Sequence, residues 1–165
     1  MQRNRGDGTF AETAWFSGVE ASDWSWGPIF LDVDLDGFED ILISNGVSRD
    51  FQNVDVAERV RRQMAGPRLT QNEILQLVGQ FPTLATPNLI FRNKHDGTFE
   101  SMGAAWGFDL RGISQGMALA DLDSDGDLDV VINNLNDAPG LFRNEGNAGR
   151  LAVQLKGTGR NRAGV

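Results

Sequence analysis

The chain has 165 residues and a net charge of −8, and it is long enough for one domain with a hydrophobic core or for a piece of a larger domain. It contains no cysteine, so disulfide and thiolate chemistry are excluded. Two short segments hold ten of the 23 acidic residues, which leaves 23 − 10 = 13 acidic against 15 basic residues elsewhere. The acidity is therefore local, and local acidity favours bound cations over a generally acidic surface.

Residues 1–50 are expected to form the first of two repeats. Asp7-Gly8 suits a tight hairpin turn. The apolar runs 28–31 and 41–43 contain β-branched residues and are bounded by Gly, Asn and Asp, which predicts two buried strands. The acidic segment 32–40 then joins the two strands of a hairpin.

This segment has the spacing of a calcium loop. It carries carboxylates at positions 1, 3, 5 and 9 and a glycine at position 6. Calcium takes about six to eight oxygen ligands, and alternate residues of a tightly curved loop point inward, where glycine permits the sharp turn. The predicted ligands are the side chains of Asp32, Asp34, Asp36 and Asp40 and the backbone carbonyl of Phe38.

Residues 51–87 interrupt the β pattern and predict a helical insertion. One helix is expected over 55–65, ended by Gly66-Pro67. Thr70-Gln-Asn-Glu73 has the spacing of a capping box and opens a second helix through Val78. Without this insertion the repeat period falls to about 52 residues, the size of one four-stranded propeller blade.

Residues 88–144 are expected to hold the second repeat and the start of a third. Arg3-Asn4, Asp7-Gly-Thr-Phe10 and the acidic loop all recur, shifted by 89 positions, and such self-similarity is typical of stacked supersecondary units. The second loop, 121–129, predicts a second calcium site. Its predicted ligands are the side chains of Asp121, Asp123, Asp125 and Asp129 and the backbone carbonyl of Asp127.

An EF-hand begins with the same spacing, but it needs a glutamate at position 12 and a helix on each side. Position 12 is Ile43 in the first loop and Ile132 in the second. The flanks predict strands, so an EF-hand is excluded. Magnesium is the weaker candidate ion, because it demands near-ideal octahedral geometry and keeps its waters.

Residues 141–144 begin a third copy, Leu-Phe-Arg-Asn, which does not continue as Asp-Gly-Thr-Phe. Instead, 150–156 alternate like an amphipathic strand. We therefore expect a different module to begin within 145–165.

These segments resemble FG-GAP/VCBS repeat proteins, whose propeller blades are related to those of integrin α subunits. The likeness is carried by Phe-Arg-Asn-x-x-Asp-Gly-Thr-Phe, by the Asp-x-Asp-x-Asp-Gly-x-x-Asp loops and by the insertion between them. The tail 151–164 resembles the beginning of the ASPIC/UnbV domain of the cartilage-acidic-protein-like family. The resemblance implies a secreted or cell-surface β-propeller with structural calcium held by the loop aspartates. Family members act in adhesion, extracellular matrix and carbohydrate or protein recognition.

We therefore expect a mainly β chain of two propeller-type blades that belongs to a larger propeller or assembly. The expected function is a calcium-binding, non-enzymatic module of an extracellular or periplasmic protein, with a protein or glycan ligand. Neither a nucleic-acid partner nor a membrane span is expected. Two alternatives stay open: a calcium-dependent enzyme domain acting on polysaccharide, and a structural repeat of a surface fibre or layer.

Two further features have more than one interpretation. Trp15, Trp24 and Trp26 fit packing between blades, and they also fit a stacking platform for a sugar. His95, the single histidine, lies beside Asp96-Gly97 in a predicted turn. No nucleophile accompanies it, so a solvated side chain is expected there rather than a catalytic base.

Overall fold

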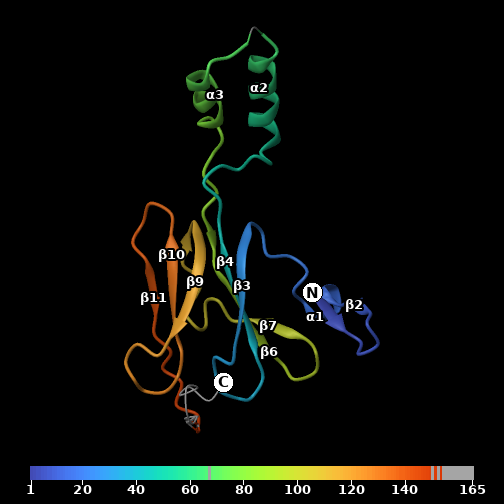
Figure 1. The fold of residues 1–165 in the computed structure, drawn as a ribbon, viewed down its shortest axis with the longest axis vertical. Helices are drawn as coiled ribbons and strands as arrows, with labels where there is room; N and C mark the ends of the chain where they lie inside the picture. The colour runs from blue at the N-terminus through green and yellow to red at the C-terminus, as the bar shows by residue number, and fades with distance from the viewer. Residues whose placement is uncertain (67, 150, 152, 154–165) are drawn as a thin grey trace, which may run out of the picture.

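Antiparallel strands dominate the computed structural model, which describes residues 1–66, 68–149, 151 and 153 (Figure 1). The larger sheet has four strands in the order β3-β4-β6-β7. These strands are β3 (Ser25–Leu31), β4 (Asp40–Asn45), β6 (Leu89–Asn93) and β7 (Phe99–Ser101). The prediction of a mainly β chain with few helices is confirmed.

A second sheet has the strand order β11-β10-β9. It consists of β9 (Ser114–Ala120), β10 (Asp129–Asn134) and β11 (Gly140–Phe142). Two small pairs complete the described strands, β1 (Gln2–Asn4) with β2 (Phe10–Glu12), and β5 (Thr86–Pro87) with β8 (Arg111–Gly112). A single turn of helix, α1 (Ala14–Ser17), follows β2.

The strands repeat as the sequence predicts, but the sheets do not coincide with the repeats. Strands β1, β2, β3 and β4 end at the positions that, 89 residues later, end β6, β7, β9 and β10. The four-stranded sheet therefore combines β3 and β4 of the first copy with β6 and β7 of the second. Each copy of the sequence thus contributes to two sheets.

The two sheets pack face to face over one apolar core. Leu31, Leu42 and Ile90 of the larger sheet lie against Val130 and Ile132 of the smaller one. Leu42 and Ile132 are 1% and 0% exposed, and burial of such a side chain contributes about 1.5–3 kcal/mol. The opposite face of the larger sheet carries a separate cluster of Ile41, Ile43 and Phe91, against which Val19, Leu89 and Phe99 pack.

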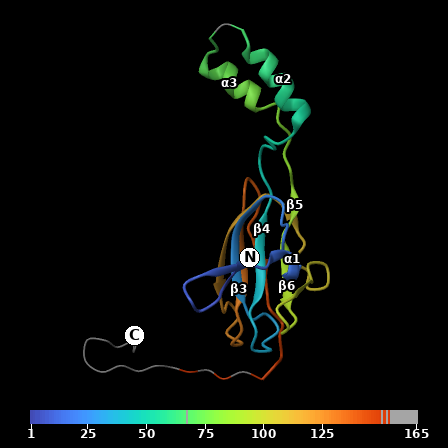
Figure 2. The same ribbon diagram turned by 90° about the vertical axis from the view of Figure 1, so that its right-hand side faces the viewer.

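The predicted insertion is a pair of helices that stands at one end of the sheets (Figures 1 and 2). Helix α2 (Val54–Met64) is capped by Asn53, whose side chain accepts from the Val56 amide at 3.1 Å. Helix α3 (Gln71–Val78) begins with the predicted capping box between Thr70 and Glu73. Val56, Val60, Leu77 and Phe81 form a core of their own. No helix among the described residues is long and apolar enough to cross a bilayer.

The tryptophans do not follow the packing prediction uniformly. Trp15 is 80% exposed and Trp26 is 52% exposed, so neither is buried between sheets. Trp15 belongs to the one-turn helix beside the β1–β2 pair, away from the stacked sheets (Figure 1). Most of the predicted tail module, residues 150, 152 and 154–165, lies outside the described residues.

Candidate metal centre

Both acidic loops lie at the end of the sheets opposite the helices (Figure 1). The first joins β3 to β4 and the second joins β9 to β10, which confirms the predicted hairpins. Gly37 and Gly126, at loop position 6, have φ of 91° and 94°. Leu35 and Ser124, at position 4, also have positive φ, 56° and 63°. Such values are uncommon outside glycine, so the same strained path recurs in both loops.

Backbone amides turn the loop carboxylates inward. Asp32 Oδ2 accepts from the Gly37 amide at 2.9 Å, and Asp121 Oδ2 accepts from the Gly126 amide at 3.1 Å. At position 5, Asp36 and Asp125 each accept from the amide two residues later, at 2.9 and 3.1 Å. These bonds are local, so the loop sequence itself holds its carboxylates in place.

The result is a cluster of carboxylate oxygens in each loop. One oxygen from each of Asp32, Asp34 and Asp36 lies within 4.8 Å of the others. In the second loop the group within 4.8 Å is Asp121, Asp123 and Asp129, so the two triads share positions 1 and 3 and differ in the third member. Two like charges about 4 Å apart repel by about 1 kcal/mol in water, and by more in a lower dielectric. A cation at the centre would remove this repulsion.

The aspartates at position 9 are buried and tie each loop to the neighbouring strand. Asp40, 1% exposed, accepts from the Val33 amide at 3.1 Å and from the Asn93 amide at 2.8 Å. Asp129, 0% exposed, accepts from the amides of Leu122 and Asn144, both at 2.8 Å. Burial raises the pKa of the Asp40 carboxyl, while its two amide donors lower it and the charges of neighbouring aspartates raise it further.

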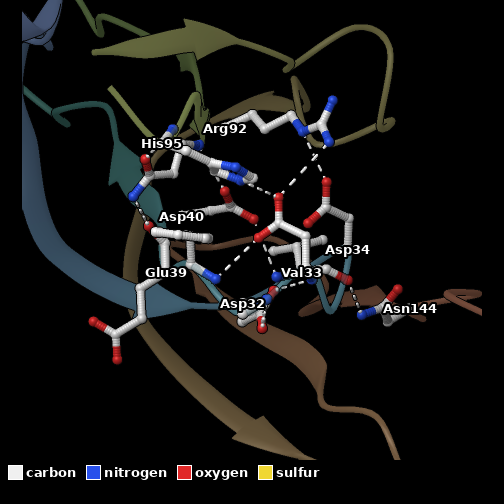
Figure 3. A network of polar contacts seen from close by, with 12 residues as sticks. Asp32, Val33, Asp34, Glu39, Asp40, Arg92, His95 and Asn144 are labelled. Carbon is white, nitrogen blue, oxygen red and sulfur yellow. Dashed lines mark hydrogen bonds and ion pairs between the residues drawn. The ribbon is translucent and has the colours of Figure 1, made fainter. Parts of the chain in front are cut away.

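Two side chains that the sequence analysis did not assign to the site also reach the first loop (Figure 3). Arg92 Nε lies 2.7 Å from Asp34 Oδ2, and Arg92 Nη2 lies 3.8 Å from Asp36 Oδ2. His95 Nε2 lies 2.6 Å from Asp36 Oδ2, and its ring stacks on Phe38 with centroids 3.9 Å apart. The hydrogen bond from His95 is the main cause that lowers the pKa of Asp36. The His95 side chain is 45% exposed, in line with the expectation of a solvated side chain, and it also contacts the loop.

The second loop has an equivalent arginine. Arg143 Nη1 lies 3.6 Å from Asp123 Oδ2, and its Nη2 also contacts Glu145. That glutamate contact is the main cause that raises the pKa of Arg143. Both arginines belong to the repeated Phe-Arg-Asn segment. Because this segment recurs beside each loop, the sequence repeat could have indicated that both arginines contact the loop aspartates.

The burial of one carboxylate oxygen in the first loop also favours a bound cation, independently of the spacing of the aspartates. Asp34 Oδ1 is buried, and no described residue hydrogen-bonds to it, whereas its Oδ2 is held by Arg92. A buried carboxylate oxygen without a partner is costly unless an ion or water satisfies it. Oxygen donors alone suit a hard cation such as calcium or magnesium. Each aspartate triad could thus hold an ion.

Comparison with known proteins bears on the second loop directly. Residues 77–132 match the FG-GAP-like repeat. This segment is an FG-GAP-like repeat. It runs from the end of α3 to Ile132 and so contains the whole second loop. The predicted family resemblance is confirmed over this part of the chain.

A second comparison finds a distant relative that matches part of the chain. Cartilage acidic protein 1 of Xenopus tropicalis is 42% identical over 57 residues, which are 34% of this chain and 9% of that protein. The chain therefore matches only a small part of its relative's length. The shared part is of the size of one repeat, so the relative's overall activity does not transfer to this chain.

The structure therefore brings some of the predicted ligands together and not others. The structure brings together Asp32, Asp34 and Asp36, and also Asp121, Asp123 and Asp129. Asp40 instead accepts two backbone amides. Asp125 accepts the Asp127 amide, and the Asp127 side chain is 2% exposed. The carbonyl ligands assigned to Phe38 and Asp127 stay predictions.

Proposed function

We propose that this chain is a calcium-binding, non-enzymatic module of an extracellular β-propeller that serves adhesion or the recognition of a protein or glycan. The observation that carries the proposal is the duplication of the loop. Two sites 89 residues apart share their backbone path, the clustered carboxylates of positions 1 and 3, and an arginine beside position 3. Such agreement is expected when both loops perform one task.

The sheets support the propeller part of the proposal. A four-stranded antiparallel sheet packs face to face on a second sheet whose strands are its sequence copies. Propellers stack such sheets around a central axis. In this arrangement each ion fixes a hairpin at the same end of its blade, so its role is structural.

Calcium is favoured over magnesium, and this favours an extracellular location. Several carboxylates on one tightly turned loop suit calcium's large, irregular coordination sphere, and extracellular modules of this kind bind calcium at about 10⁻⁴–10⁻³ M. Such sites fill where calcium is abundant. Ligand recognition is then left to surfaces that the ions hold rigid.

Calorimetric titration and thermal unfolding test the proposal. The purified chain should bind two calcium ions, and saturation at about 100 times Kd should stabilise it by about 2.7 kcal/mol per site. Asp34→Ala and Asp123→Ala should each abolish one site. Glu20→Ala is the matched control, since Glu20 is acidic and exposed but lies outside both loops.

Equal melting temperatures in EDTA and in calcium would refute the proposal. Magnesium at the same concentration should give a smaller stabilisation than calcium. If magnesium stabilises the chain as strongly, the assignment of the ion fails although the sites stand.

A further inference from the structure

A second candidate site adjoins the first ion loop. A cleft of about 450 Å³ opens between the β1–β2 lobe with α1 and the turn that joins β6 to β7. We name it the first cleft. Its walls include Arg3, Phe16, Phe38, His95, Asp96 and Phe99.

The first cleft has a counterpart at the next junction. A cleft of about 400 Å³ lies between the two sheets, and Ile90, Ala105 and Trp106 line it. These are the residues 89 positions after Met1, Phe16 and Ser17, which line the first cleft. Three lining positions of the first cleft therefore recur in a cleft at the next junction.

The first cleft shares a wall with the ion loop. Phe38 occupies loop position 7, and its ring stacks on His95 at 3.9 Å with an interplanar angle of 19°. His95 in turn contacts Asp36 at 2.6 Å. An ion that fixes this loop therefore fixes two side chains of the cleft wall, Phe38 and His95.

We propose that the first cleft binds a saccharide through stacking on Phe16 and Phe38, in a manner that depends on the ion in the first loop. This inference rests on the proposed function, because it assigns a place to recognition. Phe16 is 65% exposed and Phe38 is 45% exposed, so both rings offer an apolar face to a ligand. The C–H face of a pyranose ring matches such faces.

The polar groups of the cleft suit the edge of the same ring. Arg3, His95 and Asp96 are planar hydrogen-bonding side chains beside the phenylalanines. Cationic and anionic groups occur together there, which matches neutral hydroxyls better than a strongly charged ligand. A volume of about 300–1,000 Å³ is usual for small-ligand sites, and the cleft lies within this range. A lipid surface would need an unbroken apolar area, which the interleaved polar groups exclude.

The test uses ligand-observed saturation-transfer NMR on the calcium-loaded chain. The probes are four trisaccharides at millimolar concentration: cellotriose, chitotriose, mannotriose and galactotriose. The tripeptide Gly-Phe-Gly is tested beside them and represents a peptide ligand. At least one trisaccharide should bind. Phe16→Ala should weaken its binding about tenfold, which is the size expected from one lost stacking contact. Phe16→Tyr keeps the aromatic ring and should bind the trisaccharide as the wild-type chain does.

Trp15→Ala is the matched control. Trp15 neighbours Phe16 on α1 and is 80% exposed, but it does not line the cleft. Its substitution should leave saccharide binding unchanged, and EDTA should weaken binding to the wild-type chain. The inference is overturned if no trisaccharide binds, if only the tripeptide binds, if Trp15→Ala rather than Phe16→Ala weakens binding, or if EDTA has no effect.

Calcium titration of the same samples separates the two proposals. Phe16→Ala should still bind two calcium ions with unchanged affinity. Two bound ions without saccharide binding would refute the cleft inference alone. Failure to bind calcium would refute the proposed function.

Discussion

The two acidic loops share the hydrogen bonds of positions 1, 5 and 9 and differ in the side chains that contact them from outside. The first is approached by Arg92 at 2.7 Å and by His95 at 2.6 Å. The second is approached by Arg143 at 3.6 Å, and that arginine also contacts Glu145. The loop sequence thus fixes where the carboxylates point, while the neighbouring strand decides how firmly they are held. Sites that are identical by spacing need not be identical in affinity.

The largest expected effect is on the free energy of unfolding, when the aspartate at position 9 of either loop is replaced. Asp40→Ala and Asp129→Ala each leave two partly buried amide donors without their carboxylate acceptor. Each such hydrogen bond contributes about 0.5–1.5 kcal/mol, so either variant should lose about 1–3 kcal/mol of the free energy of unfolding. Urea denaturation in EDTA measures this without any contribution from ions. A loss in one variant only would show that the copies are not equivalent at position 9.

The arginines should separate the loops. Outer-sphere partners of metal ligands typically contribute about 10–100-fold to affinity. Arg92→Ala should therefore lower the calcium affinity of the first site within that range. Arg143→Ala should lower the affinity of the second site less, because its guanidinium is farther from Asp123. Calorimetric titration of both variants checks the order, and equal losses would remove the distinction.

A smaller effect is expected from His95. This residue has φ of 64°, a conformation that asparagine tolerates better than most side chains. His95→Asn therefore removes the imidazole while retaining the backbone. Calcium affinity should fall a few-fold at the first site and stay constant at the second. Affinity lost equally at both sites would argue for a general loss of structure instead.

The smallest effect concerns the other end of the sheets. The first sheet carries the helical insertion where the second has only a short connection between β10 and β11. The helices pack on Val56, Val60, Leu77 and Phe81, which belong to neither sheet core. Replacing residues 49–82 with a short Gly-Ser linker should leave calcium binding at both sites unchanged. Calorimetric titration measures this, and loss of either site would show that the helices support the loops.

Much of this arrangement follows from local rules. The capping box at Thr70, the hairpins and the inward carboxylates depend on neighbours within a few residues, so the sequence predicts them. Arg92 and His95 reach the first loop from about 55–60 positions away, and no local spacing reveals such contacts. The contact between His95 and Asp36 lies outside the sequence prediction for this reason. Exposure of Trp15 depends likewise on where α1 lies relative to the sheets.

The mismatch between repeats and sheets constrains how such a chain can be cut or enlarged. A break between the two copies, near residues 45–88, separates β4 from β6, its hydrogen-bonded neighbour. Each half would then expose the backbone edge of a divided sheet, which is a template for aggregation. An added copy likewise completes one sheet and begins another. The unit that duplicates is therefore not the unit that folds, and stable fragments should end between sheets instead of between copies.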